Sequence, residues 1–354
     1  MAVLNILCFS EENFARELGK RTDDRDVESY IYKEQRGDFQ DALTFLRPRK
    51  HPERLRPLLA SLDIADSAVI EIRRMDASLG EVLVASSVAG IERGLVVINP
   101  EDGHWIDSDQ VTKILQQAGL NSWEIFDKFD PHQVKDAAWN FLDDLKEIRA
   151  ERSKKGPCIP VDQHFNVKGV GLVAIGTVQS GSLKKHDNIV VTPGGASGVV
   201  RSLQVMDVDV EIANSGDRVG VAIRNMKEGS LERGVQLSVK GNEEMFQIHN
   251  SSSLTVIQAP FQKREVQIGT VIHASTDLQF VVGRVTKIEN QELNDKDELY
   301  QAAVEIIKSE GKASTSFLQR KLQIGYNRAA RIIDMMEADG IVSKANHVGK
   351  RDVL

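Results

Sequence analysis

The stretch that decides the fold lies in the middle of the 354-residue chain. Residues 165–178 read Phe-Asn-Val-Lys-Gly-Val-Gly-Leu-Val-Ala-Ile-Gly-Thr-Val, and residues 181–191 read Gly-Ser-Leu-Lys-Lys-His-Asp-Asn-Ile-Val-Val. Short β-branched runs are broken by Gly, Asn, Asp and Ser at steps of roughly ten residues, which is typical of an antiparallel sandwich or barrel. Gly169, Gly171 and Gly176 lie inside the expected strands, where a small barrel needs bends. The stretch therefore predicts a small β-barrel.

A later turn makes the prediction more specific. Residues 213–220 read Ala-Asn-Ser-Gly-Asp-Arg-Val-Gly. With the glycine spacing described above, this turn resembles the second, β-barrel domain of the elongation factor Tu family, here residues 158–240. The resemblance implies a nucleotide-binding domain ahead of the barrel. It also implies tRNA or the ribosome as a partner of the barrel. The candidate contacts for such an acidic partner are the scattered cations Lys168, Arg201, Arg224 and Arg233, and the alternative is that they form an ordinary solvated face. An unrelated barrel is the alternative.

Composition sets limits on the class of protein. The chain is 41% hydrophobic and 27% charged, which is typical of a globular protein with two to four domains. No run of apolar residues is long enough to span a membrane, the start lacks a signal-peptide pattern, and Cys8 and Cys158 form no paired motif. We therefore expect a cytoplasmic protein without a membrane partner. The net charge of −7 argues against indiscriminate nucleic-acid binding by the whole chain, but not by one domain.

Residues 1–150 alternate strands with helices and predict an α/β domain with a mostly parallel sheet. Its expected strands are Val3–Phe9, Ala68–Ile72 and Leu95–Ile98, and its expected helices are Leu55–Leu62, Gly80–Gly90, Asp109–Ala118 and His132–Leu145. This outline resembles the GTPase domain that precedes the barrel in elongation factors.

The chemistry of a GTPase is missing from this outline. Residues 14–21 (Phe-Ala-Arg-Glu-Leu-Gly-Lys-Arg) stand where a phosphate loop needs G-x-x-x-x-G-K-[ST], so Gly19-Lys20 is interpreted as a helix end. Residues 46–50 (Leu-Arg-Pro-Arg-Lys) replace the D-x-P-G-H element, and residues 99–102 (Asn-Pro-Glu-Asp) replace the guanine-reading N-K-x-D. The chain thus resembles archaeal elongation-factor-Tu-like proteins with degenerate GTPase domains. We expect no GTP hydrolysis, no catalytic residue, no cofactor and no metal.

Two further segments connect the domains. The charged residues 146–156, which are followed by Pro157, predict a hinge into the barrel. Residues 241–290 predict a partial third β domain, which is either half a barrel or strands packed on the second domain. Its expected strands are Leu254–Ile257, Val266–Ile272 and Phe280–Ile288. The polar residues 289–296 predict a linker.

Residues 297–354 predict a winged helix, that is, a helix-turn-helix followed by a β-hairpin. A first helix follows from the helical spacing of Leu299, Ala302, Ala303, Ile306 and Ile307. Ser316 and Gln319 form a capping-box pattern for a second helix, and Tyr326–Asp339 is the third. Residues 341–343 and 352–354 predict two strands that flank the tip of the wing.

The third helix separates core from surface. At about 100° per residue, Ala329, Ile332, Ile333 and Met336 share one face, and Asn327, Arg331 and Asp334, with Arg328 beside them, lie opposite. An amide, a guanidinium and a carboxylate can read adenine, guanine and the cytosine amine in a major groove. The alternative is a solvated face on a protein-docking winged helix.

Residues 313–320 (Ala-Ser-Thr-Ser-Phe-Leu-Gln-Arg) and 324–333 (Ile-Gly-Tyr-Asn-Arg-Ala-Ala-Arg-Ile-Ile) resemble the gamma domain of the FtsK DNA translocase, and the match continues to Leu354. In that family the domain reads short G-rich DNA sequences and contacts the XerD recombinase. The family's base-reading Asn and Arg carry over to Asn327 and Arg331, and Asp334 stands where many members have Glu. The DNA-binding candidates are Asn327, Arg328, Arg331, Asp334, Arg320, Lys344, His347, Lys350 and Arg351. No Walker motif of a motor is present.

The two resemblances leave several functions open. The favoured one is a non-enzymatic protein whose winged helix binds G-rich double-stranded DNA sequence-specifically, with a GTPase-dead scaffold as its body. The alternative is a translation-linked factor that binds tRNA or an RNA hairpin, as the selenocysteine-specific elongation factor does through its own winged helices. A fusion of two independent halves is a third possibility. DNA is favoured because the major groove of A-form RNA is too narrow to admit such a helix.

Overall fold

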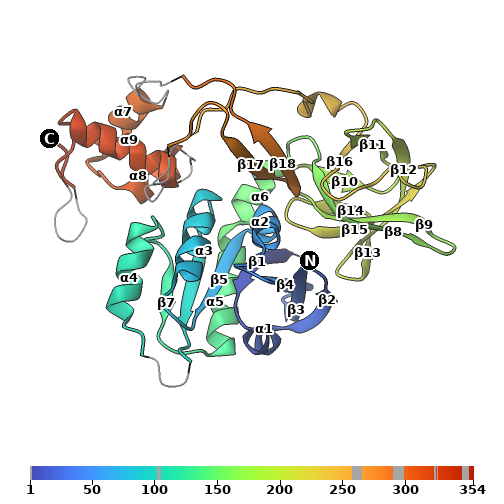
Figure 1. Ribbon diagram of the computed structural model, residues 1–354, viewed down its shortest axis with the longest axis horizontal. Helices are drawn as coiled ribbons and strands as arrows, with labels where there is room; N and C mark the ends of the chain where they lie inside the picture. The colour runs from blue at the N-terminus through green and yellow to red at the C-terminus, as the bar shows by residue number, and fades with distance from the viewer. Residues whose placement is uncertain are drawn as a thin grey trace. The chain divides into compact units, whose positions relative to one another are not determined.

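The computed structural model describes residues 2–101, 105–256, 265–289, 299–322, 324, 326–344 and 351–354. Within these ranges the side chains of Glu243, Tyr326, Asn327 and Ala338 are not described. The chain divides into two compact units. The first contains Met1–Val266 and Thr270–Arg284, and the second contains Gln267–Gly269 and Val285–Leu354 (Figure 1).

The N-terminal part of the first unit is a seven-stranded sheet with helices on both sides. Its strands are β1 (Val3–Phe9), β2 (Lys20–Asp24), β3 (Val27–Arg36), β4 (Phe39–Pro48), β5 (Ser67–Ile72), β6 (Gly94–Ile98) and β7 (Glu124–Phe126). Its helices are α1 (Glu12–Leu18), α2 (Leu55–Ile64), α3 (Ala77–Val88), α4 (Ser108–Gln117), α5 (Pro131–Asp144) and α6 (Lys146–Arg152). The strand order is β2-β3-β4-β1-β5-β6-β7, with parallel pairing from β4 to β7. The α/β prediction is confirmed.

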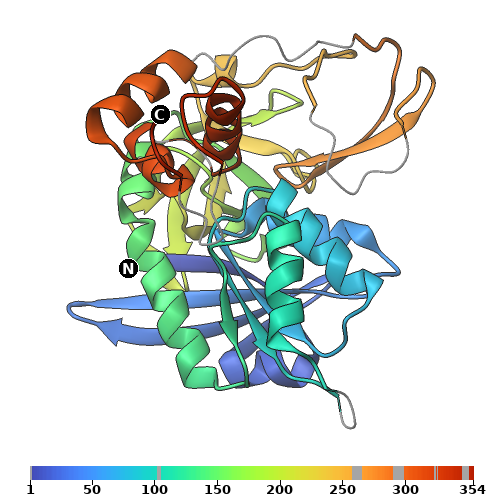
Figure 2. The same ribbon diagram turned by 90° about the vertical axis from the view of Figure 1, so that its left-hand side faces the viewer.

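Alternation along β1 explains why the sheet is covered on both faces. Leu4 and Ile6 point into a core formed with α1 and α5, whereas Leu7 points into a core formed with α2, α3 and α4. Figure 2 shows these helices on opposite sides of the strands. A strand that is buried on both faces reads as a continuous apolar run, and that is why Val3–Phe9 was predicted correctly.

The sequence pattern did not predict the antiparallel strands β2, β3 and β4. Strands β3 and β4 form a hairpin around Gly37, whose φ of +63° favours glycine. Residues 33–36 of β3 (Lys-Glu-Gln-Arg) are polar and only partly buried, which hides the apolar pattern of that strand. The expected start of α3 at Gly80 is also wrong. The helix begins at Ala77, because Asp76 Oδ1 accepts a hydrogen bond from the Leu79 amide at 3.0 Å.

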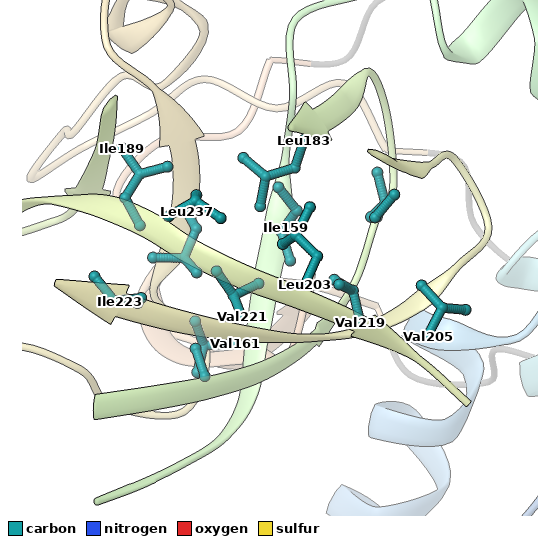
Figure 3. Packing of buried hydrophobic residues seen from close by; sticks show 14 of the residues in the cluster. Ile159, Val161, Leu183, Ile189, Leu203, Val205, Val219, Val221, Ile223 and Leu237 are labelled. Atoms are coloured by element: carbon teal, nitrogen blue, oxygen red, sulfur yellow. The ribbon is translucent and has the colours of Figure 1, made fainter. Parts of the chain in front are cut away.

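The second part of the first unit is a closed six-stranded barrel, as predicted. Its main strands are β8 (Ile159–Val167), β9 (Gly171–Thr177), β11 (Asn188–Thr192), β12 (Ser197–Val205), β15 (Arg218–Arg224) and β16 (Gln236–Val239). The barrel closes because β11 pairs with both β16 and β12. Short strands β10 (Ser182–Lys184), β13 (Val208–Val210) and β14 (Ile212–Asn214) lie at its ends. Inward residues such as Ile159, Leu203 and Val221 fill it (Figure 3). A Cβ at Gly176 would lie 2.3 Å from the Pro160 carbonyl oxygen, so β8 and β9 require glycine there.

The expected hinge at residues 146–156 is wrong, because most of it is helix α6. Arg149 on this helix is buried, and its guanidinium donates to the Val3 carbonyl and to Asp66 Oδ2, both at 2.6 Å. A Cβ at Gly216 of the barrel would lie 2.3 Å from Arg149 Cζ. Val3 also belongs to the core cluster of the barrel. The segment therefore fastens the α/β domain to the barrel.

Beyond the barrel, a short 3-10 turn (Glu243–Met245) precedes a two-stranded hairpin, β17 (Val271–Thr276) and β18 (Gln279–Arg284). No strand occupies residues 254–256, and Ile257 lies outside the described residues, so that expected strand is wrong where it can be compared. The hairpin turn packs on α2, where Asp63 Oδ2 accepts from Ser275 Oγ at 3.0 Å and from the Leu278 amide at 3.1 Å. The same turn also contacts the barrel, because Gln236 Nε2 of β16 donates to the Asp277 carbonyl at 3.2 Å. The described strands therefore do not form half a barrel; they contact the second domain, as the other alternative expected, and the first domain as well.

The second unit contains α7 (Tyr300–Glu310), α8 (Thr315–Leu322) and α9 (Tyr326–Ala338). Residues 351–354 run back antiparallel through isolated bridges between Val342 and Val353 and between Ala313 and Arg351. The expected strands at 341–343 and 352–354 are thus formed only as single bridges, and we call residues 351–354 the returning strand. The predicted winged-helix order is confirmed in these residues. Two details differ from expectation. Ala302 is exposed, and Tyr300 and Val304 are buried in its place. Ser314, not Ser316, caps α8, because its Oγ accepts from the Phe317 amide at 3.2 Å.

Candidate nucleic-acid interface

Helix α9 presents one buried and one exposed face, as its sequence phase predicts. Ala329, Ile332, Ile333 and Met336 are fully buried against the other helices of the second unit. Arg331 and Asp334 are exposed on the opposite side, and Arg328 is half-buried. Asn327 occupies the first turn of the same face, but its side chain lies outside the described residues.

The remaining candidates lie on α8 or in the wing. Arg320 on α8 is exposed, and its Nε donates to the Ser316 carbonyl at 3.2 Å. Lys344 is exposed at the start of the wing. His347 and Lys350 fall within residues 345–350, which lie outside the described residues. The structure therefore brings Arg331, Arg320 and Lys344 to the surface of one small domain without defining the wing tip.

Arg351 differs from the other candidates because its guanidinium contacts α9. Its Nε donates to Glu337 Oε2 at 3.0 Å, and its Nη2 lies 3.4 Å from Asp334 Oδ1. The Arg351 side chain is only 19% exposed, against 68% for Asp334. Partial burial raises the pKa of Asp334, Arg351 opposes that shift, and Glu337 adds to it. The sequence did not predict the pairing of Arg351 with Glu337, since 14 residues separate them.

The first domain has a second candidate region, at the carboxyl ends of its parallel strands. There only Ser10 and Glu11 separate β1 from α1, whereas a phosphate loop needs several residues to wrap its ligand. The expected alignment of that loop with residues 14–21 is wrong, because residues 12–18 are α1 itself. Gly19 follows the last residue of α1 and Lys20 begins β2, so the interpretation of Gly19-Lys20 as a helix end is confirmed.

The loops around this edge are joined by their own side chains. The buried Glu71 accepts from the Glu11 amide at 2.7 Å and from Asn99 Nδ2 at 2.5 Å, and burial raises its pKa. Arg73 pairs with Glu11 at 2.8 Å and with Glu101 at 3.1 Å. A cavity of about 300 Å³ lies beside them and is lined by both basic and acidic groups. Asp102, the last residue of the expected guanine-reading segment, lies outside the described residues.

Two of the four cations considered on the barrel have internal partners. Arg201 Nη1 donates to the Gly169 and Val170 carbonyls at 2.9 and 2.7 Å. Arg233 pairs with Asp26 at 2.6 Å and with Asp162 at 3.3 Å. Lys168 and Arg224 are exposed. The described part of the barrel thus has no dense basic patch built from these four residues.

The described residues contain no group of three or more His, Cys, Asp or Glu side chains placed to hold a metal ion. None of their helices combines the length and the apolar character that crossing a membrane requires.

Comparison with known proteins agrees with the division of the chain into two units. The family model for elongation factor Tu domain 2 matches residues 171–238, and the model for the FtsK gamma domain matches residues 294–354. The fold is similar to that of the elongation factor SelB from Methanococcus maripaludis, with a TM-score of 0.63 at 20% identity over 79% of this chain and 64% of that one. The DNA translocase FtsK of Mesorhizobium japonicum is 58% identical over 60 residues, which is 17% of this chain and 7% of the translocase.

These matches define a multidomain protein with an elongation-factor-like body and a C-terminal winged helix of the FtsK gamma type. The uncharacterized protein MJ0325 of Methanocaldococcus jannaschii is 30% identical over 283 residues, which is 80% of this chain and 85% of that protein. The chain belongs to the family of that archaeal protein. It spans only small parts of the translocase and less than two thirds of SelB.

Proposed function

We propose that this chain is a non-enzymatic protein that binds double-stranded DNA through its second unit and reads G-rich sequence with α9. The observation that carries the proposal is the exposed face of α9. Arg331 lies there opposite a fully buried apolar face, in a domain that the FtsK gamma family model matches over residues 294–354. An exposed guanidinium on such a helix can bond to guanine O6 and N7 in the major groove.

In this proposal the residues divide into two kinds of contact. Asn327, Arg328, Arg331 and Asp334 are the base-reading candidates, because they lie on α9. Arg320, Lys344, His347 and Lys350 are phosphate-contact candidates, because Arg320 and Lys344 are exposed cations and the wing is expected to lie along the DNA backbone. Phosphate contacts supply affinity and salt dependence, and base contacts supply discrimination. A recombinase or another protein is a further candidate partner of the same domain.

The body is a GTPase-dead scaffold in this proposal. Its support is that Ser10 and Glu11 are the only residues between β1 and α1, and that Glu71 and Arg73 already join the neighbouring loops. A phosphate group would have to displace the Glu71 carboxylate from the Glu11 amide. The scaffold then serves to carry and present the DNA-reading domain.

Fluorescence anisotropy of the full chain tests the function. We expect tighter binding to a labelled G-rich duplex than to a duplex of equal length and scrambled sequence. Arg331→Ala should remove most of that difference. Equal affinity for both duplexes, unchanged in Arg331→Ala, would leave the second unit as a protein-docking module.

A second function, that of a translation-linked factor, is supported by the fold of the body. SelB is a translation elongation factor, and its structure covers 79% of this chain. Filter binding of the chain to aminoacyl-tRNA and to RNA hairpins, in parallel with duplex DNA, separates the two functions. Tighter binding to RNA than to G-rich duplex DNA would favour the translation-linked one.

A further inference from the structure

The returning strand at the chain end is tied to α9 by more than its backbone. Ser343 N donates to the Asp352 carbonyl at 2.8 Å, Leu354 N donates to the Ile341 carbonyl at 2.9 Å, and Ala313 bridges Arg351. These bonds join the strand to the residues that follow α9 and precede α8. These backbone contacts do not determine how the strand is oriented relative to the exposed face of α9.

The Arg351 side chain supplies that missing constraint. Its Nε bonds to Glu337 at 3.0 Å, with the two side chains 19% and 26% exposed, and its Nη2 reaches Asp334 at 3.4 Å. Glu337 and Asp334 are three residues apart on α9, so their carboxylates repel each other on the same stripe of the helix. One planar guanidinium between them relieves that repulsion and fixes both side chains.

Exposed cations behave differently in the same domain. Lys344 is exposed at the start of the wing, and among the described residues it has no ion-pair partner. A phosphate can take such a cation without breaking a contact of the free protein. Taking Arg351 would instead leave two carboxylates of α9 unpaired next to a polyanion.

We propose that Arg351 is a positioning residue that clamps the last strand to α9 through Glu337 and holds Asp334 in place for base reading, and that it does not contact a phosphate. This inference rests on the proposed DNA-reading function. It reassigns Arg351, which the sequence alone places among the DNA-binding cations. It also makes Glu337 a specificity determinant, although Glu337 touches no base.

Two quantities measured on the full chain separate the two roles of Arg351. The first is the ratio of affinities for the G-rich and the scrambled duplex, in which general charge effects cancel. The second is the dependence of log affinity on log salt, whose slope changes by about 0.9 for each phosphate that the protein no longer neutralises. For Arg351→Gln we expect the ratio of affinities to fall by about tenfold, because losing this half-buried ion pair should cost more than losing an exposed pair and less than losing a fully buried one. The salt dependence should stay unchanged.

Lys344→Gln is the matched control, since it removes one cation from the wing. It should reduce the slope of log affinity against log salt by about 0.9 and leave the ratio of affinities unchanged. Arg351→Lys keeps the charge but cannot span both carboxylates, so its ratio should lie between those of the parental chain and Arg351→Gln. Glu337→Gln approaches the pair from the other side and should also lower the ratio, even if Arg351→Gln does not fold.

The inference is overturned if Arg351→Gln behaves as Lys344→Gln does, or if Glu337→Gln leaves the ratio unchanged. A different result would contradict the proposed function, namely equal affinity of the parental chain for the G-rich and the scrambled duplex. A melting temperature for each variant shows that the compared proteins are folded.

Discussion

Glu71 Oε2 accepts a hydrogen bond from the backbone amide of Glu11 at 2.7 Å, at the entry to α1. In a nucleotide-binding α/β domain the backbone amides of this loop bind phosphate. Here a buried carboxylate of the chain itself takes the amide, and Glu11, with its own acidic side chain, is held by Arg73. A phosphate could therefore reach this amide only by displacing the Glu71 carboxylate.

From this arrangement we expect no useful affinity for guanine nucleotides. Isothermal titration of the full chain with GTP and with GDP, each with Mg²⁺, should give no heat of binding. A ligand that binds only the folded state raises the melting temperature. Millimolar nucleotide should therefore leave the melting temperature of this chain unchanged. Micromolar affinity for either nucleotide would contradict the GTPase-dead assignment of the body.

Sequence periodicity predicted the parts of this fold whose side chains segregate cleanly. Ala329 and Ile332 were assigned to the core of the second unit from their phase alone, and both are fully buried. Periodicity failed for β3, where residues such as Lys33 and Glu34 are half-buried polar side chains. It also failed for α6, because the buried, ion-paired Arg149 looks like one more charge in a polar linker.

The site could be predicted only in part for a related reason. Arg331 was placed on the exposed face of α9 by helical phase, which is a local property. Arg351 reaches Glu337 through a returning strand, and no local pattern specifies which acid a distant arginine meets. Asp63 illustrates the same limit, because its carboxylate binds the turn of a hairpin 212 and 215 residues further along.

Residues up to about 288 and residues from about 297 should behave as separate folding units. Limited trypsin digestion should cut first at Lys287 or Lys296, because the intervening polar segment has few apolar side chains to bury. The Lys287 side chain is 76% exposed. Mass spectrometry should identify two resistant fragments that meet at this segment. Replacing both lysines with alanine is the control and should delay the first cut, whereas one resistant core that spans the segment would contradict the prediction.

Arg331→Ala should cost about 1–3 kcal/mol of binding free energy on a G-rich duplex and relax discrimination at one base pair, as expected when a bidentate guanine contact is removed. Competition anisotropy against duplexes with single base-pair changes measures both effects. Arg54→Ala is the control, because Arg54 is also exposed but belongs to the first domain. Discrimination that is equal in Arg331→Ala and in the parental chain would exclude base reading by this residue.

The α/β domain and the barrel share an ion network centred on Asp162. This buried carboxylate of β8 accepts from Arg218 at 2.9 Å and lies 3.3 Å from Arg233 and 3.4 Å from Arg25 of the first domain. Burial alone would raise the pKa of Asp162, but Arg218, Arg233 and Arg25 together outweigh it and lower that pKa. A carboxylate with a lowered folded-state pKa stabilises the fold above its unfolded pKa.

Asp162→Asn should therefore reduce the free energy of unfolding of the body by about 3 kcal/mol at neutral pH, because it leaves three arginines around a neutral amide. The difference from the parental chain should begin to shrink as pH falls below about 4, the ordinary pKa of an Asp in the unfolded chain, and should disappear only at the lower pH where the folded-state carboxylate is itself protonated. Urea unfolding followed by circular dichroism across that pH range measures both effects.

Asp207→Asn is the matched control. Asp207 also pairs across the two domains, with Lys33 at 3.5 Å, but its side chain is 95% exposed. That variant should change the unfolding free energy by less than about 0.5 kcal/mol. An equal destabilisation in both variants would show that burial of Asp162 does not strengthen this contact between the domains.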